Sequence, residues 1–188
     1  MGQRLNIEIT DGNKCLANCY YHWSAYTKEA AILTYNIIQY WKVLHNDISD
    51  PLQLAVRLLE LTGGGVNIEE RVMIQADHSF NNMTFQPSTN RNRGLISVTE
   101  NGINGTRACE EGRVTIDIAH HIVTFGVWCY MPHKEFADEY GSIGDEYSPA
   151  YATWQVLPFM FDRIDDFYTF TKDKDSLYDQ NGVYMFIE

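Results

Sequence analysis

Positively charged residues are scarce in this chain. Its 188 residues include 14 Lys and Arg against 25 Asp and Glu, and the formal net charge at pH 7 is −11. Such a charge repels phosphate backbones and anionic lipids, so we expect no direct nucleic-acid binding and no membrane binding. It permits a basic protein as a partner. The acidity is concentrated in residues 135–188, where twelve acidic and three basic residues give a net charge of −9.

Targeting segments and cofactor motifs are also lacking. The sequence has no signal peptide and no long apolar run, which predicts a soluble protein of the cytoplasm. Its four cysteines form no Cys-x-x-Cys pair, and in that compartment we expect them to stay reduced. The glycine triplet 63–65 precedes no Gly-Lys-Ser/Thr sequence, which excludes a P-loop. We therefore expect no cofactor and no metal site.

Apolar residues are plentiful enough for one core. They make up 45% of the chain, and the length of 188 residues predicts a single domain. We expect an α+β fold with a mainly antiparallel sheet of about six or seven strands and helices packed on one face. Its parts are an N-terminal hairpin at 3–24, a helical segment at 27–77, central strands at 94–131 and an acidic C-terminal segment at 135–188.

Alternation of apolar and polar residues predicts a hairpin between residues 113 and 131. The turn is either two residues, His120-His121, or a four-residue loop with the same pairing. Either turn brings the apolar residues of both strands to one face. The predicted pairs are Ile118–Val123, Ile116–Phe125 and Val114–Val127.

The same pattern predicts a hairpin around Asp11-Gly12-Asn13. A three-residue loop there makes Cys15 and Cys19 buried thiols. The predicted pairs are Ile9–Cys15, Ile7–Ala17 and Leu5–Cys19. The opposite face is polar, either solvated or a ligand surface, and it carries Arg4, Asn6, Glu8, Asn18, Tyr20 and His22.

Three helices are predicted in the segment 27–77. The first runs from Thr27 to about His45 and has an apolar stripe along one side. Asp50-Pro51, a capping acid before a proline, starts the second, which ends at the glycine triplet acting as a C-cap and joint. A capping-box pattern predicts a third, shorter helix at 72–76.

The later segments are less regular. Residues 95–100 predict a strand, and two Asn-Gly pairs at 101–105 predict a turn across which 107–109 pairs. Residues 148–157 fit either the start of a helix or a strand. An amphipathic helix is predicted after Pro158, and a last short strand at 183–187.

Two places are candidate ligand sites. The polar loop 78–93 ends in Arg91-Asn92-Arg93, the only clustered positive charge in the chain, and arginine forks suit phosphate or carboxylate groups. The polar face of the first hairpin is the other. A nucleotide-like ligand would then have its phosphate on the arginines and its base stacked on an aromatic ring. The expected ligand-binding residues are Arg4, His22, Trp23, Tyr26, Arg91 and Arg93.

Three segments carry a resemblance to a group of proteins. They are Gly2–Ile7, Tyr21–Thr27 and Arg91–Ile96. Together they resemble small bacteriophage-encoded proteins of Gram-positive hosts, and no catalytic motif accompanies them. The resemblance implies a protein that acts in the cytoplasm of an infected bacterium, where small acidic phage proteins inhibit host immunity.

These features predict an acidic inhibitor that sequesters a small phosphate-containing signalling molecule or occupies a host protein. An enzyme is the alternative: a small hydrolase acting on a nucleotide-like substrate. Its residues would be His22 with a nearby nucleophile among Cys19, Ser24 and Thr27, or Asp117 with His120 or His121 as an acid–base pair. The missing catalytic motif disfavours the enzyme, and we assign no catalytic residue. A virion assembly protein and a homo-oligomer stay open.

Overall fold

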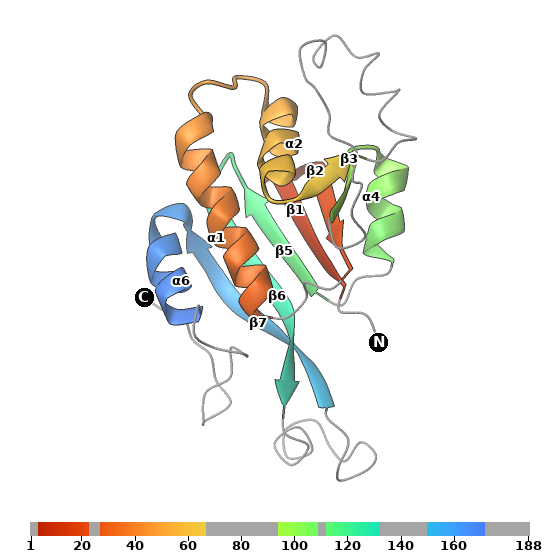
Figure 1. The fold of residues 1–188 in the computed structure, drawn as a ribbon, viewed down its shortest axis with the longest axis vertical. Helices are drawn as coiled ribbons and strands as arrows, with labels where there is room; N and C mark the ends of the chain where they lie inside the picture. Colours follow the sequence, from red (N-terminus) through yellow and green to blue (C-terminus); the bar gives the residue numbers. More distant parts are fainter. Residues whose placement is uncertain (1–3, 23–26, 67–93, 109–111, 132–149, 172–188) are drawn as a thin grey trace.

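The computed structural model describes residues 4–22, 27–66, 94–108, 112–131 and 150–171. These residues form one seven-stranded sheet in the order β3-β4-β2-β1-β5-β6-β7. The strands are β1 (Leu5–Asp11), β2 (Lys14–Tyr21), β3 (Gly64–Val66), β4 (Gly94–Ser97), β5 (Gly112–Asp117), β6 (Ile122–Met131) and β7 (Ala150–Met160). Neighbouring strands are antiparallel except in the β1–β5 and β3–β4 pairs. The predicted α+β fold with a mainly antiparallel sheet is confirmed (Figure 1).

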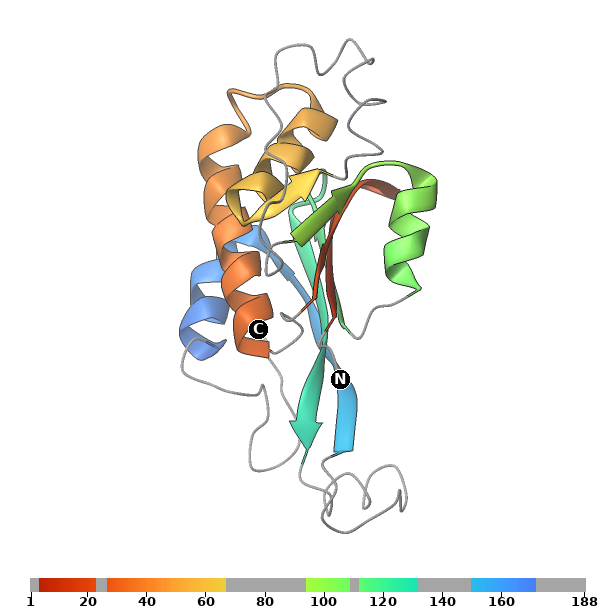
Figure 2. The same ribbon diagram turned by 45° about the vertical axis from the view of Figure 1, so that its right-hand side comes forward.

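Three helices pack on one face of the sheet, as predicted. They are α1 (Thr27–Leu44), α2 (Pro51–Leu61) and α6 (Ile164–Thr171), the last preceded by a short 3-10 helix, η2 (Phe161–Arg163). The fourth helix, α4 (Glu100–Arg107), lies on the opposite face (Figure 2). Of the helices within the described ranges, none is long and apolar enough to cross a membrane.

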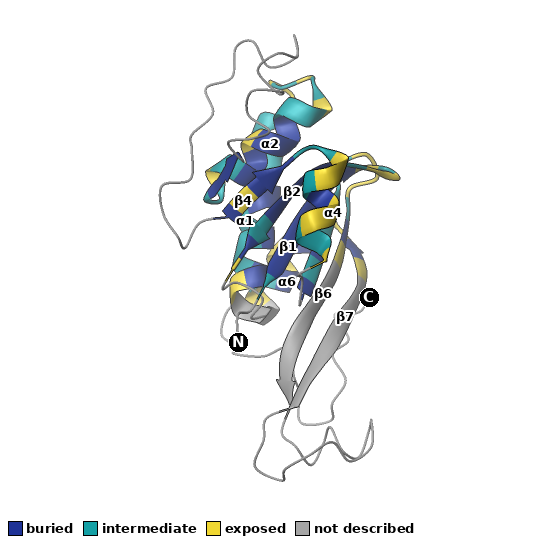
Figure 3. Cartoon of the chain, turned by 90° about the vertical axis from the view of Figure 1, so that its right-hand side faces the viewer, coloured by how far each residue is buried: buried dark blue, intermediate teal, exposed yellow. Residues whose placement is uncertain are grey.

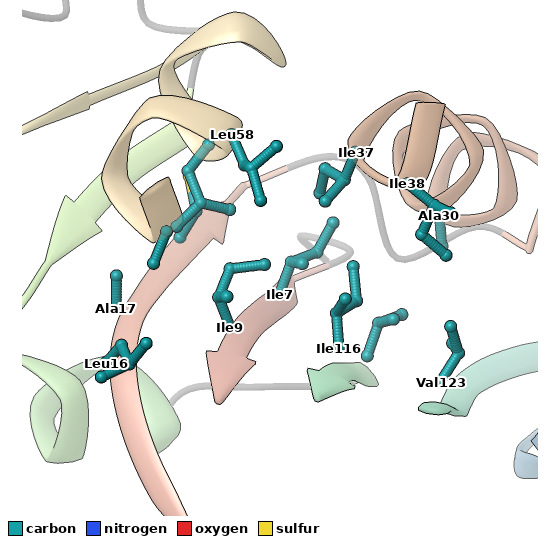
Figure 4. Packing of buried hydrophobic residues seen from close by; sticks show 14 of the residues in the cluster. Ile7, Ile9, Leu16, Ala17, Ala30, Ile37, Ile38, Leu58, Ile116 and Val123 are labelled. Atoms are coloured by element: carbon teal, nitrogen blue, oxygen red, sulfur yellow. The ribbon is translucent and has the colours of Figure 1, made fainter. Parts of the chain in front are cut away.

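The apolar core lies between the sheet and the three helices. Every second residue of β1 faces it, and Leu5, Ile7 and Ile9 are fully buried. Figure 4 shows side chains of α1 and α2 pointing at those of the sheet. Burying one aliphatic side chain contributes about 1.5–3 kcal/mol, so this layer holds the helices to the sheet.

The first two helices match the prediction closely. Ala30, Ala31, Ile37 and Ile38 of α1 are buried. The carboxylate of Asp50 accepts a hydrogen bond of 2.9 Å from the backbone N–H of Gln53, and so caps α2. The glycine triplet has a second role that was not predicted. Gly63 has a φ of +94° after the helix, but residues 64 and 65 belong to β3.

Both hairpins have the predicted faces but a register shifted by two residues. In the first, Ile7 pairs with Cys19 and Ile9 with Ala17. The turn has two residues, Gly12 and Asn13, and a bulge after Ile9 adds one residue to β2. The bulge puts Cys15 opposite Thr10, where it is half-buried, so the prediction of a buried thiol is wrong for Cys15 and right for Cys19.

The central hairpin pairs Ile116 with Val123 and Val114 with Phe125. Its loop has four residues, 118–121, and His121 adopts a left-handed φ of 57°. The carboxylate of Asp117 accepts hydrogen bonds from the backbone N–H groups of Ala119 and His120, at 3.0 and 3.2 Å. These bonds stabilise a four-residue loop at 118–121. Both predicted turns were centred one residue later in the sequence, so the predicted pairing is wrong for either turn length.

One local prediction after residue 100 is wrong, and another is right except for where the element starts. The predicted turn at 101–105 and the strand predicted from Arg107 are replaced by α4, which the side chain of Thr99 caps by accepting from the N–H of Gly102 at 3.2 Å. The helix predicted after Pro158 begins only at Phe161, because Phe159 and Met160 still pair with β6. For residues 150–157 the strand alternative holds. The predicted helix at 72–76, the loop 78–93 and the strand at 183–187 lie outside the described residues.

Candidate functional site

Four strand ends meet at one end of the sheet. β1, β4 and β5 begin there, and β2 ends there. The residue pairs that fix this arrangement are Leu5–Tyr21, Leu95–Tyr20 and Leu5–Gly112. We call this place the Arg4 end of the sheet, because Arg4 directly precedes β1.

All six predicted ligand-binding residues belong to chain segments that join the sheet at the Arg4 end. Arg4 and His22 are described, the first half-buried and the second exposed. The other four lie outside the described residues. In the sequence, Trp23 and Tyr26 follow β2 directly, and Arg91 and Arg93 precede β4 directly. The pairing of Tyr20 with Leu95 thus brings together two strand ends that are about seventy positions apart in the sequence.

Tyr20 and His22 form a polar aromatic pair at this end. The hydroxyl of Tyr20 lies 3.0 Å from Nδ1 of His22, and the ring centroids are 6.2 Å apart. Asn6 of β1 pairs with Tyr20 on one side and with Arg113 of β5 on the other. Directly paired residues share a face, so a polar row crosses three strands on the face that carries α4.

Glu8 lies at the centre of this face. Its side chain is only 4% exposed, and Arg107 of α4 contacts both carboxylate oxygens: Nε lies 2.6 Å from Oε1 and Nη2 lies 2.8 Å from Oε2. Arg113 approaches the same carboxylate at 3.7 Å, a charge contact beyond hydrogen-bond length. The buried carboxylate therefore fixes the guanidinium of Arg107 by two hydrogen bonds, as a planar fork allows, and attracts that of Arg113.

Two buried asparagines hold the last turn of α4 to the sheet. The hydroxyl of Thr106 donates to Oδ1 of Asn18 at 3.0 Å. The amide of Asn6 donates to the backbone carbonyl of Thr106 at 3.1 Å. The amide of Asn18 also lies 3.4 Å from Glu8. Both polar atoms of the Asn18 amide are thus hydrogen-bonded, so this side chain can be buried at little cost.

The polar face of the first hairpin is accessible only in part. Its middle, which includes Asn6, Glu8 and Asn18, is buried beneath α4 (Figure 3). The polar surface that stays accessible is at the edges of α4. There the side chains of Arg107 and Arg113 are 33% and 39% exposed. Guanidinium groups fixed at a partly exposed surface can bind a phosphate or carboxylate group.

Sequence reasoning missed Arg107 and Arg113 as site residues. Arg107 was assigned to a strand, and the parallel pairing of β1 with β5 left no local trace in the sequence. One signal was present: Glu8 is a single carboxylate between the buried Ile7 and Ile9. A carboxylate in a buried strand requires a cationic partner, so it should have prompted a search for one.

The proposed acid–base pair lies at the opposite end of the sheet. Oδ2 of Asp117 lies 2.7 Å from Nδ1 of the exposed His120. Partial burial raises the pKa of Asp117, but hydrogen bonds from His120, Gly12 and Ala119 outweigh it and lower the pKa below its usual value. His121 does not join the pair, because its ring packs against Trp41 and Phe161, with centroids 4.6 and 5.5 Å apart.

The two ends are too far apart for one site. β1 separates them with seven residues, which span roughly 20 Å at the rise of a strand. His22 and His120 therefore cannot act on one small substrate. Within the described ranges, no three His, Cys, Asp or Glu side chains are placed to hold a metal ion.

Neither described thiol is set up as a nucleophile. Burial raises the pKa of Cys19 to about 12. Partial burial, and then the nearby Glu8, raise the pKa of Cys15 to about 11. Both stay protonated near neutral pH, and a protonated thiol is a poor nucleophile.

Comparison of the chain with protein-family models, with curated proteins and with solved structures finds no match.

Proposed function

We propose that this chain is an acidic binding protein of bacteriophage type, which inhibits a host defence system by sequestering a small phosphate-containing molecule at the Arg4 end of the sheet. One observation carries the proposal. The start of β1, the end of β2 and the start of β4 lie side by side. These three strand ends are the points where the segments with all six predicted ligand-binding residues join the sheet.

Electrostatics supports the same place. A chain with a net charge of −11 repels an anion in general, so an anionic ligand needs local positive charge. Arg107 and Arg113 both contact Glu8, and Arg113 pairs with Asn6, two positions after Arg4 on the same side of β1. In the proposal, Arg91 and Arg93 add two further guanidinium groups, and Trp23 or Tyr26 stacks on the base of the ligand.

Native mass spectrometry of the chain, incubated with a bacterial lysate and purified again, tests the proposal. We expect a small extra mass on the folded chain that denaturation releases. The variant Arg91→Ala plus Arg93→Ala should lose it and keep its melting temperature. The matched control is Lys42→Ala plus Arg163→Ala, which removes two positive charges whose partners, Asp165 and Asp166, are 62% and 66% exposed.

The outcomes separate the versions of the proposal. Retention that is unchanged in the Arg91→Ala plus Arg93→Ala variant would contradict a ligand held by these arginines. Loss of the mass from the control variant as well would mean that general charge, rather than a site, holds the anion. A host protein retained in place of a small mass would favour an inhibitor that occupies that protein.

The hydrolase alternative has one observation in its favour, the contact of Asp117 with His120. A carboxylate that accepts from Nδ1 keeps Nε2 of the imidazole as the basic atom, which is how a general base is oriented. Turnover of linear or cyclic nucleotides by the purified chain, lost in His120→Gln, would support a hydrolase. Equal turnover in that variant would exclude His120 as the base.

A further inference from the structure

β7 is the last of the described strands on its side of the sheet. It pairs with β6, and no other strand among the described residues pairs with its outer edge. It has eleven residues, about twice the usual length of a strand. An edge strand of this length presents a long row of backbone N–H and C=O groups that another strand can pair with.

The sequence of β7 lacks the protection that edge strands usually carry. Native edges are commonly blocked by charged residues, prolines or bulges. The strand reads Ala-Tyr-Ala-Thr-Trp-Gln-Val-Leu-Pro-Phe-Met and contains no Asp, Glu, Lys, Arg or His, in a chain of which 21% is charged. Its proline, Pro158, lies at the register shift between the Val123–Phe159 and Phe125–Val156 pairs. The blocking features are thus confined to one end, and residues 150–156 form a regular, uncharged edge.

The pairing of β6 points the same way. β5 accompanies β6 only from Ile122 to Gly126, whereas β7 accompanies it to Met131. Residues 127–131 and 150–154 therefore form a two-stranded ribbon that extends beyond the rest of the sheet (Figures 1 and 2). A two-stranded ribbon alone is marginally stable in water, and three or more strands are needed for stability.

We propose that two copies of this chain pair antiparallel along β7 about a two-fold axis, so that their two sheets become one continuous sheet. The two ribbons then form four strands in the order β6-β7-β7-β6. An axis at Thr153, the middle of the regular edge, places Thr153 opposite its own counterpart and Ala150 opposite Val156 of the second copy.

The absence of charged residues in β7 favours a second copy over a basic protein as the occupant. The net charge of −11 attracts basic partners, but β7 offers them no carboxylate to bind. Two identical uncharged strands meet without like charges along the seam, and an antiparallel pair of identical strands has a two-fold axis, so each contact is made twice. The proposal is independent of any ligand at the Arg4 end.

Sedimentation velocity at about 0.15 M salt and at a chain concentration of about 100 µM tests the proposal. We expect the mass of two chains, that is, twice 21.7 kDa. Thr153→Lys places two lysines opposite each other at the axis, and this variant should sediment as one chain with an unchanged circular dichroism spectrum. Thr169→Lys, the same change at an exposed position of α6, should stay dimeric.

A second variant identifies the seam without weakening it. Thr153→Cys should give a disulfide-linked dimer under mild oxidation, because directly opposed residues come within disulfide distance. The wild-type chain, oxidised in the same way, shows how much cross-linked dimer its four native cysteines produce. A wild-type chain that sediments as a single chain overturns the proposal, even if β7 then captures another protein. A dimer that persists in Thr153→Lys and gives no Thr153→Cys cross-link overturns the β7 seam.

Discussion

Glu8 and Arg107 are ninety-nine positions apart in the sequence and form a two-point ion pair, with N–O distances of 2.6 and 2.8 Å. The pair fastens α4 to the centre of the sheet. The side chain of Glu8 is 4% exposed and that of Arg107 is 33% exposed. A surface pair contributes little because water competes for both ions, but removing one partner of a buried pair leaves the other ion without compensation.

Arg107→Ala should therefore destabilise the chain by about 3 kcal/mol, near the lower end of the range for a broken buried pair, because Arg113 still lies 3.7 Å from Glu8. Urea unfolding at neutral pH measures this loss. Arg163→Ala is the matched control. The side chain of Arg163 is 39% exposed, a fraction similar to the 33% of Arg107, but its partner Asp166 is 66% exposed. We expect the control to lose less than about 1 kcal/mol. Equal losses in the two variants would show that burial of Glu8 does not decide the strength of the pair.

Asp117 should make stability depend on pH. Its pKa is lowered in the folded chain, because the hydrogen bonds it accepts outweigh its partial burial. A lowered pKa contributes stability that is present above the unfolded pKa, about 3.9, and is lost as pH falls through the folded pKa. Asp117→Asn should therefore be less stable than wild type at pH 7, and the difference should shrink below about pH 4. Chemical unfolding at pH 7, 5 and 3 measures it. A constant difference would exclude ionised Asp117 as its source.

The two hairpins illustrate how far the sequence specifies a sheet. Alternation with period two correctly identified core-facing residues such as Ile7, Cys19, Ile116 and Val123, and failed at Cys15, which follows the bulge. It could not identify the register, because a shift by two residues preserves every face. The turns decided the register through features that alternation does not contain: the bulge after Ile9 and the hydrogen bonds that Asp117 accepts.

α4 could not be predicted from its own residues. It contains Gly102 and Gly105, each after an asparagine, and such pairs favour turns and weaken helices. The helix is held by contacts with distant parts of the chain, from Thr106 to Asn18 and from Arg107 to Glu8. For the same reason, the arginine site formed by Arg107 and Arg113 at Glu8 could not be predicted from the sequence. In contrast, α1 and α2 have apolar stripes and, for α2, a capping acid, so their positions were predicted well.

Cys15 and Cys19 should react slowly with iodoacetamide at pH 8. A thiol with a pKa of about 11, as for Cys15, has roughly a hundredfold less thiolate at that pH than one with an ordinary pKa of 9.0. Cys19, with a pKa of about 12 and no exposed surface, should be slower still. Peptide mapping by mass spectrometry follows each cysteine, and the chain in denaturant gives the reference rates. Rapid labelling of Cys19 in the folded chain would contradict its burial.

Two glycines of the chain occupy opposite environments. A β-carbon on Gly94, at the start of β4, would collide with the sulfur of Cys19 and lie 2.8 Å from the ring of Tyr21. A β-carbon on Gly105 would meet no atom within 4 Å. Gly105→Ala should therefore stabilise α4 by about 0.5–1 kcal/mol, since alanine favours helices and nothing opposes it.

Gly94→Ala should destabilise the chain by about 1–3 kcal/mol, because the added methyl group overfills the contact between β4 and β2. Cys19→Ala removes the sulfur atom and alone costs about 1 kcal/mol as a small cavity. In the double variant the new methyl group takes up the space of the sulfur, so the double variant should lose clearly less than the sum of the two single variants. Urea unfolding of the four chains measures this coupling. Additive losses would mean that the added methyl group clashes with the ring of Tyr21 or with the backbone, and not with the sulfur of Cys19. β4 and β2 would then pack differently at the Arg4 end.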